Sequence, residues 1–364
     1  MLSCGVSDGV VVTEASQSKC REHVIYEFYR EELLTDSGVP RLDRARNYFA
    51  VHDDLGMLVD LYSFWRDSAE YLLLRRIDTW TGEVRYKAVK CSKRGNDVYV
   101  ARCRKRFNFL SDMDNDVVFF HAGDFDVKTD VRSSLLFLTL TYDTKRCSRS
   151  TAWENVGKEW NRFISAMRSR YGCISVMRSW EAFENGYPHI HAILWFEETS
   201  FGVFPWLEKE QDGKTQFSYR VKDKAQFEGL WHSWVDTTAI SSMKKATNYV
   251  SKYQMKVSQG RETSGSQTTL DQHTSGAKTM ALMWLHRKRS FSVSGSFGRL
   301  WHDLTRSMHN SNHLVQVDLM GDVVEGGGWE FLGVFSAKDL GIRPWEWSVS
   351  VDPDVVDRVL RRPG

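Results

Sequence analysis

Two histidines separated by one residue, His189 and His191, are the side chains of this sequence best suited to bind a metal ion. Residues two apart on a strand point to the same side, so both imidazoles face one way, together with Ile193 and Trp195. The opposite face is apolar and consists of Ile190, Ala192, Leu194 and Phe196. Two imidazoles side by side on a buried strand commonly bind a divalent metal. The alternative is a pair of core histidines with satisfied hydrogen bonds.

The residues before the histidines offer a third ligand. Asn185-Gly186 is a strong hairpin-turn dipeptide, and Glu181 and Glu184 both precede it. Residues well before a hairpin turn lie opposite residues well after it, so the spacing favours Glu181, with Glu184 as the alternative. Two histidines and one carboxylate leave coordination positions open, as catalysis requires.

A second reactive group is the pair of tyrosines Tyr249 and Tyr253. Four residues on a helix correspond to about 40° of rotation and about 6 Å of rise, so both hydroxyls can reach one site. Three lysines flank the same face, and no acidic residue lies among them; they are Lys245, Lys252 and Lys256. The alternative is an ordinary helix with two partly buried tyrosines.

This combination suits attack of a tyrosine on a phosphodiester. A tyrosine hydroxyl has a pKa of about 10, so activation at pH 7 must offset roughly 4 kcal/mol of ionisation. Nearby lysines favour the phenolate, and a metal on a phosphate oxygen polarises the phosphorus. The attack leaves a covalent phosphotyrosine that preserves the energy of the broken bond. A second tyrosine allows a second transfer, which reseals the strand without ATP.

The elements expected to position these residues form an α+β fold, with helices packed on a central antiparallel sheet. In chain order they are a buried strand over 135–141, a long amphipathic helix after a capping box at 151–154, strands over 175–183 and 189–196, and helices over 227–234 and 242–256. Residues 258–276 are rich in Ser, Thr, Gly and Gln and are expected to form a flexible loop.

The two ends of the chain carry weaker signals. In the first 125 residues we expect a helix over 24–34 and strands over 71–77 and 98–102, with a basic tip. After His313 we expect strands over 314–319 and 330–334. A last helix should have Asp352 as its N-cap and Pro353 in its first turn.

Composition indicates a soluble globular protein, with 41% hydrophobic and 26% charged residues among 364. No apolar run approaches the roughly 20 residues of a membrane helix, and the first residues do not resemble a signal peptide. The six cysteines are scattered, which favours a reduced, cytoplasmic protein. The segment from Thr237 to His302 contains ten lysines and arginines and two acidic residues, so its net charge is +8 and that of the rest of the chain is −6. Such a local field indicates a surface that binds polyanions, although an ordinary basic surface is the alternative.

Three motifs in order resemble the HUH endonuclease superfamily, specifically the two-tyrosine class of rolling-circle replication initiators of plasmids and viruses. The first is Phe137-Leu-Thr-Leu-Thr141. The second is Trp180-Glu181-Ala-Phe-Glu-Asn-Gly186-Tyr-Pro188-His189-Ile-His191. The third is Tyr249-Val-Ser-Lys252-Tyr253-Gln-Met-Lys256. The resemblance covers about residues 131–256, and one departure is Phe183, where many relatives have a polar residue.

The resemblance implies a role for each residue. His189, His191 and Glu181 would bind Mg²⁺ or Mn²⁺. Tyr249 would be the nucleophile, Tyr253 the second nucleophile, and Lys252 would stabilise charge or position the phosphate. The residues expected to contact DNA are Lys245, Lys256, Arg287, Lys288 and Arg289. We expect an N-terminal region over 1–130 that could bind DNA, a nicking and ligating domain over 131–310, and a C-terminal extension over 311–364.

The expected partner is single-stranded DNA at a replication origin. No nucleotide-binding G-x-x-x-x-G-K-[ST] motif occurs, so unwinding would require a separate helicase, and synthesis a host DNA polymerase. The alternatives are a relaxase or transposase of the same superfamily, a DNA-binding protein without catalysis, and a metal hydrolase that uses only the histidines.

Overall fold

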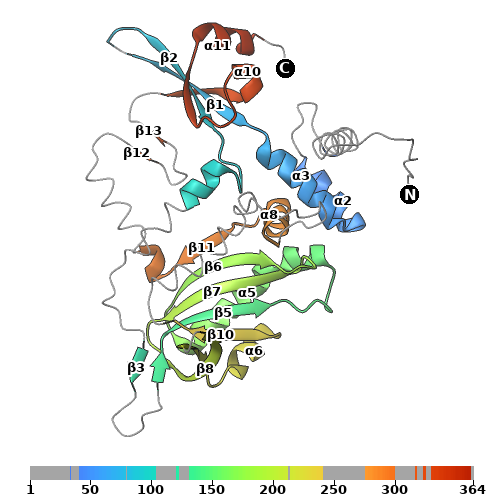
Figure 1. Ribbon diagram of the computed structural model, residues 1–364, viewed down its shortest axis with the longest axis vertical. Helices are drawn as coiled ribbons and strands as arrows, with labels where there is room; N and C mark the ends of the chain where they lie inside the picture. Colours follow the sequence, from blue (N-terminus) through green and yellow to red (C-terminus); the bar gives the residue numbers. More distant parts are fainter. Residues whose placement is uncertain are drawn as a thin grey trace.

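The computed structural model describes residue 33 and residues 41–78, 80–103, 120–122, 131–211, 214–240, 275–299, 316–317, 323–324 and 329–361. Within these ranges the chain consists of helices and antiparallel sheets, which confirms the α+β class. The largest sheet has the strand order β11-β6-β7-β5-β10-β9-β8-β4-β3 (Figure 1). Its strands are β3 (Phe120–Ala122), β4 (Val131–Ser133), β5 (Leu135–Thr141), β6 (Ile174–Ala182), β7 (Pro188–Phe196), β8 (Phe201–Gln211), β9 (Lys214–Val221), β10 (Val235–Ala239) and β11 (Phe291–Ser294).

Strands β6, β7 and β5 form the centre of this sheet. β6 and β7 are a hairpin whose register runs from Ile174 opposite Phe196 to Ala182 opposite Pro188. β5 pairs with the other edge of β7, with Thr141 opposite His189. The three strands predicted in this part of the chain are therefore confirmed to within one residue at each end.

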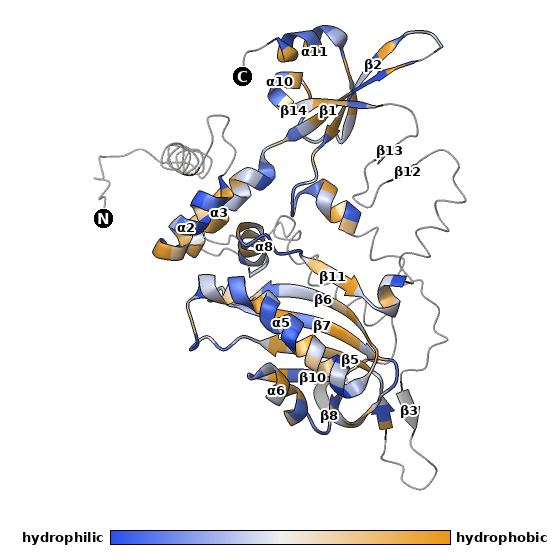
Figure 2. Cartoon of the chain, turned by 180° about the vertical axis from the view of Figure 1, so that it is seen from behind, coloured by the Kyte–Doolittle hydropathy of each residue, from blue (hydrophilic) through white to orange (hydrophobic). Residues whose placement is uncertain are grey.

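Helices cover one face of the nine-stranded sheet (Figure 2). Helices α5 (Arg149–Tyr171) and α6 (Ala225–Trp231) lie over the sheet, α8 (Ser275–Leu285) packs against β6, and α2 (Leu42–His52) and α3 (Leu55–Asp67) pack on α8. The apolar residues predicted for the long helix are all buried, from Trp153 to Met167. However, α5 begins before the predicted capping box, because the side chain of Ser148 accepts a hydrogen bond from the backbone N–H of Thr151 and acts as the N-cap.

The other face of the sheet has a smaller apolar cluster. Its buried members are Cys103, Leu135, Phe137, Met177, Ile193, Ile240 and Phe297. Polar residues occupy the same face at the end of the hairpin nearest its turn, where Glu181 and His189 are paired.

A second sheet combines strands from both ends of the chain, in the order β14-β1-β2-β15 (Figure 1). The strands are β1 (Glu70–Ile77), β2 (Val84–Lys90), β14 (Glu330–Ser336) and β15 (Ser348–Val351). Helices α10 (Ala337–Leu340) and α11 (Pro353–Leu360) pack on one face, around Tyr71 and Leu73. Asp352 caps α11 through the N–H of Asp354, at 2.8 Å, as predicted. A short pair of strands, β12 (Gln316–Val317) and β13 (Val323–Val324), precedes β14. The division of the chain at residues 130 and 310 remains a prediction.

The strand predicted over 98–102 is wrong, because residues 97–103 form a helix. Asn96 starts it: its side chain accepts a hydrogen bond from the N–H of Tyr99 at 2.9 Å, and its carbonyl accepts one from Val100. This local cap outweighs the strand preference of Val98, Tyr99 and Val100. Apart from residue 33, the predicted helix over 24–34 lies outside the described residues, as does most of the strand over 314–319.

Two further observations concern the described residues alone. None of their helices is long and apolar enough to span a membrane. The described cysteines, Cys91, Cys103, Cys147 and Cys173, form no disulfide bond with one another.

Candidate metal centre

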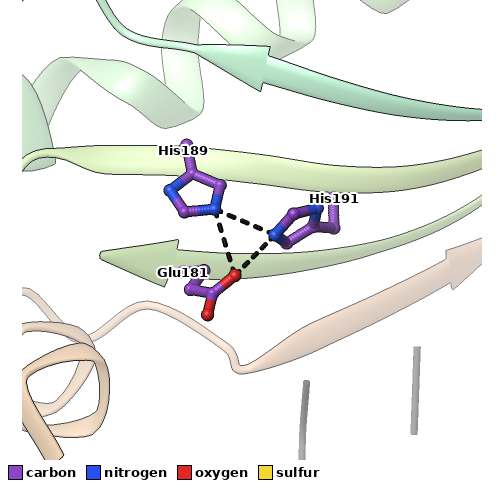
Figure 3. A group of neighbouring side chains, drawn as sticks. All are labelled: Glu181, His189 and His191. Atoms are coloured by element: carbon purple, nitrogen blue, oxygen red, sulfur yellow. Dashed lines mark hydrogen bonds and ion pairs between the residues drawn. The ribbon is translucent and has the colours of Figure 1, made fainter. Parts of the chain in front are cut away.

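Three side chains with metal-binding atoms converge near the turn of the β6–β7 hairpin (Figure 3). The Nε2 atoms of His189 and His191 are 2.9 Å apart. Oε2 of Glu181 is 3.0 Å from Nε2 of His189 and 2.5 Å from Nε2 of His191. The histidine side chains are 8% and 6% exposed, and that of Glu181 is 15% exposed. The three residues thus form one compact, largely buried group.

The hairpin register brings these side chains together. Glu181 lies directly opposite His189, and Ser179 lies opposite His191. Glu184, the alternative third ligand, is in the turn, and its backbone oxygen accepts a hydrogen bond from Lys278 at 3.1 Å. The structure therefore groups the histidines with Glu181.

Helix α5 fixes the turn that sets this register. Gly186 has a φ of 83°, a conformation that favours glycine. The indole N–H of Trp153 donates to the Gly186 carbonyl at 2.8 Å. Arg149 donates to the carbonyls of Asn185, at 3.2 Å, and Asp53, at 2.6 Å. The turn is thereby tied both to α5 and to the junction of α2 with α3.

Neighbouring side chains orient the two imidazoles. Nδ1 of His191 is 3.1 Å from the hydroxyl of Thr139, and its ring stacks on Phe137 with an interplanar angle of 8°. The ring of His189 packs against Phe183, with centroids 4.2 Å apart. Phe183 thus packs against the ring of a metal-binding candidate and limits its movement. Nδ1 of His189 is buried without a hydrogen-bond partner among the described residues.

The electrostatics of the group favour a charged carboxylate. Burial by itself would raise the pKa of Glu181, but hydrogen bonds and positive charge from His189 and His191 outweigh it and lower the pKa to about 2. Glu181 is therefore ionised at neutral pH, which is the form that binds a cation.

The donor set fits a small divalent cation. The Nε2 atoms of the two imidazoles are 2.9 Å apart, a distance at which two facing lone pairs would repel each other. Either a proton on one nitrogen or a cation bound by both must therefore lie between them. Ligands that bind one cation at about 2.1 Å and at right angles are roughly 3 Å apart. The observed separations are 2.5–3.0 Å. The hydroxyl of Thr139 contacts Nδ1 of His191, the ring nitrogen that faces away from the group. Hydrogen bonds of this kind hold metal-binding imidazoles in a fixed orientation.

The predicted tyrosine helix falls in the part of the chain that is not described. Tyr249, Lys252, Tyr253, Lys245 and Lys256 all lie outside the described residues.

The described residues on either side of this segment can be placed. Ile240 belongs to the apolar cluster on the same sheet face as the histidines. Ser275, at the start of α8, donates to the carbonyl of Ala182 at 3.0 Å, one residue beyond Glu181. The described residues on both sides of this segment therefore contact the sheet that carries the metal-binding group.

Two of the three consecutive basic residues expected to bind DNA contact different helices. Arg287 is exposed and lies 3.4 Å from Asp43 on α2. Lys288 turns towards α5, where it donates to the carbonyl of Glu154 at 3.3 Å. Arg289 is exposed.

Sequence reasoning did not assign roles to Thr139 and Phe137, the two neighbours of His191. Both belong to the strand motif Phe137-Leu-Thr-Leu-Thr141, so the signal was present. The alternation of β5 places them on the histidine face, with Thr139 directly opposite His191.

Comparison with known protein families adds an independent observation. Residues 135–258 match the family described as replication-associated protein ORF2. The matched stretch is about a third of the chain and includes β5, the metal-binding hairpin and both tyrosines. No curated protein and no solved structure matches the chain. The family match supports a role in DNA replication, as a replication initiator.

Proposed function

We propose that this protein is a rolling-circle replication initiator of the HUH endonuclease superfamily, which nicks single-stranded DNA at an origin and later religates it. The observation that carries the proposal is the convergence of Glu181, His189 and His191 within the stretch that matches a replication-associated family. The same stretch contains Tyr249 and Tyr253, so one short region supplies both metal-binding side chains and nucleophiles.

In the proposed reaction the phenolate oxygen of Tyr249 attacks the scissile phosphorus. The bond from phosphorus to the 3′ oxygen breaks, and that oxygen takes up a proton and leaves as a free 3′-hydroxyl. The product is a 5′-phosphotyrosine. Lys252 stabilises the phenolate and the phosphate, and Tyr253 allows a second transfer. A 3′-hydroxyl then attacks the phosphotyrosine, which restores the phosphodiester and the free tyrosine.

Glu181, His189 and His191 would hold the divalent metal, Mg²⁺ or Mn²⁺. When bound there, it would polarise a non-bridging phosphate oxygen. The buried position of the group limits the number of water molecules around these ligands, and the hairpin gives them a rigid frame. We propose that a separate helicase and a host polymerase complete replication in the cytoplasm.

The direct test is covalent capture of DNA. Tiled single-stranded oligonucleotides from the replicon that encodes the chain are incubated with the protein and Mn²⁺. We expect a protein–DNA adduct that survives SDS and disappears in EDTA. Mass spectrometry of the adduct then identifies the tyrosine that attacks.

Two sets of variants sharpen this test. Y249F combined with Y253F, and H189A combined with H191A, should each abolish the adduct. Y48F is the matched control, because Tyr48 lies on α2, outside the stretch that matches the replication-associated family, and its hydroxyl lies 3.7 Å from Sδ of Met57. An adduct that survives loss of both tyrosines would contradict the mechanism, and DNA binding without cleavage by the wild type would indicate a non-catalytic protein. Cleavage confined to a transfer origin or a terminal hairpin would instead identify a relaxase or a transposase.

A further inference from the structure

A second group of charged side chains lies at the edge of the nine-stranded sheet, on the face opposite to the metal centre. Strand β11 is the last strand of the sheet on this side, next to β6 (Figure 2). Successive residues of a strand point to opposite faces of the sheet. Ser179, opposite His191, is on the face of the metal centre, so its neighbour Arg178 points to the face that the helices cover. We call the group of Arg178, Lys288, Ser292, Arg168 and Ser294 the cationic edge.

Arg178 is held in a fixed orientation without a carboxylate partner. Its guanidinium lies 4.2 Å from the ring centroid of Trp180 and 5.3 Å from that of Trp160. Its Nε donates to the hydroxyl of Ser292 at 2.9 Å. No acidic side chain among the described residues forms an ion pair with it, and burial lowers its pKa to about 10. Among the described residues, no side chain or carbonyl accepts a hydrogen bond from the two terminal nitrogens of this guanidinium, which could therefore bind a ligand.

Lys288 brings a second cation to the same place. Burial and the positive charge of Arg178 lower the pKa of its ammonium group. Nζ lies 3.5 Å from the position that a Cβ on Gly157 would occupy, so a glycine in α5 gives the ammonium room beside the helix. The acid that opposes this charge, Glu154, is exposed.

The pattern continues along β11. Arg168 on α5 lies 3.5 Å from the hydroxyl of Ser294, two residues beyond Ser292. Alternate serines of the edge strand are therefore each next to an arginine. Arg178 is half-buried and forms no ion pair with a described acidic residue, and the acid that opposes Lys288 is exposed. Such partly compensated charges are costly to bury, so an anion from outside the chain would relieve this cost.

We propose that the cationic edge binds phosphate groups of a DNA strand, with one phosphate held between Arg178 and Lys288. A guanidinium binds two phosphate oxygens in a fork, and the serine hydroxyls offer further hydrogen bonds. The choice of DNA rests on the proposed function, whereas the preference for phosphate rests on the side chains alone. Because the edge and the metal centre are on opposite faces of the sheet, this contact holds the polymer and takes no part in cleavage.

The test is the salt dependence of DNA binding by the full chain, measured by fluorescence anisotropy with a labelled single-stranded oligonucleotide in EDTA. Each lost contact between a cation and a phosphate should reduce the slope of log K against log[salt] by about 0.7. We expect R178Q and K288Q each to show this reduction, with affinity about tenfold weaker near 0.1 M salt. R162Q is the matched control, because Arg162 is exposed and lies about 140° further round α5 than Gly157.

The outcomes separate this proposal from the proposed function. Slopes of R178Q and K288Q equal to that of R162Q would overturn it. If R178Q melts below the assay temperature, K288Q decides, because Lys288 is less embedded in the core. If 10 mM inorganic phosphate raises the melting temperature of the wild type but not of K288Q, while the DNA slopes are unchanged, the edge binds small phosphate compounds and the DNA proposal fails. Reduced slopes without any covalent adduct would support the edge and refute nicking, whereas adducts with unchanged slopes would do the reverse.

Discussion

Replacement of Gly186 by alanine should both destabilise the protein and weaken metal binding. Gly186 has a φ of 83°, which costs a residue with a Cβ about 1–2 kcal/mol. A Cβ here would also lie 2.6 Å from Cδ of Arg149. Displacement of Arg149 would break its hydrogen bonds to the carbonyls of Asp53 and Asn185, at roughly 1–1.5 kcal/mol each. The expected loss of unfolding free energy is therefore about 3–5 kcal/mol.

A matched control isolates the contribution of these contacts. Gly82 also has a positive φ, of 71°, but a Cβ there would meet no atom within 4 Å. G82A should therefore cost only the backbone term of about 1–2 kcal/mol. Urea unfolding, followed by tryptophan fluorescence and circular dichroism, measures both variants. Calorimetric titration with Mn²⁺ should show affinity reduced about tenfold in G186A, because its turn sets the position of Glu181 opposite His189, and unchanged in G82A.

Equal destabilisation by G186A and G82A would refute the reasoning about Arg149. Unchanged Mn²⁺ affinity in a destabilised G186A would show that the hairpin register does not depend on the turn. Either result would separate the stability of the turn from its role in positioning the metal-binding side chains.

Two further predictions concern single side chains. T139V should reduce Mn²⁺ affinity about 10-fold to 100-fold, because Nδ1 of His191 loses its hydroxyl partner; an unchanged affinity by calorimetry would remove Thr139 from the site. Burial, together with the positive charge of Lys288 and other cations, lowers the pKa of His286 to about 3, so the folded chain keeps it neutral while the unfolded chain protonates it near its ordinary pKa of 6.5. Stability should therefore fall as pH falls from about 6.5 towards 3, by up to about 1.4 kcal/mol per pH unit. Urea unfolding across this range should show a shallower pH dependence for H286Q, and an identical dependence would exclude His286 as its source.

The metal-binding hairpin could be predicted because its signals are local. Alternation along residues 189–196 and the Asn185-Gly186 dipeptide indicate two strands and a turn. The register itself depends on a three-residue loop, 184–186, closed by a hydrogen bond from the N–H of Phe183 to the carbonyl of Tyr187 at 2.9 Å; a two-residue loop would have placed Ala182 opposite His189. Once that register is known, Glu181 rather than Glu184 lies across from His189. The contribution of Thr139 required a further step, because it depends on which strand pairs with the second edge of β7.

Other elements depend on contacts that are distant in the sequence. The β8–β9 hairpin and β10 extend the main sheet beyond β5, but their sequences contain polar residues and Pro205, which weaken the strand pattern. The pairing of β1 with β14 joins residues such as Glu70 and Ser336, and no local signal indicates this partnership. The surroundings of Arg178 could not be predicted from the sequence either, because Trp160, Trp180 and Ser292 belong to three separate elements.

The sheet formed by both ends of the chain has a consequence for synthesis on the ribosome. β1 leaves the ribosome early but pairs with β14, more than 250 residues later. At about 5–20 residues per second, this strand waits on the order of 10–50 s for its partner. During that time the nine-stranded sheet can complete its pairing up to β11, while the edges of the β1–β2 hairpin that will bind β14 and β15 stay open. A chain that ends before β14 would keep those edges unpaired, and such open edges are sites of aggregation and proteolysis.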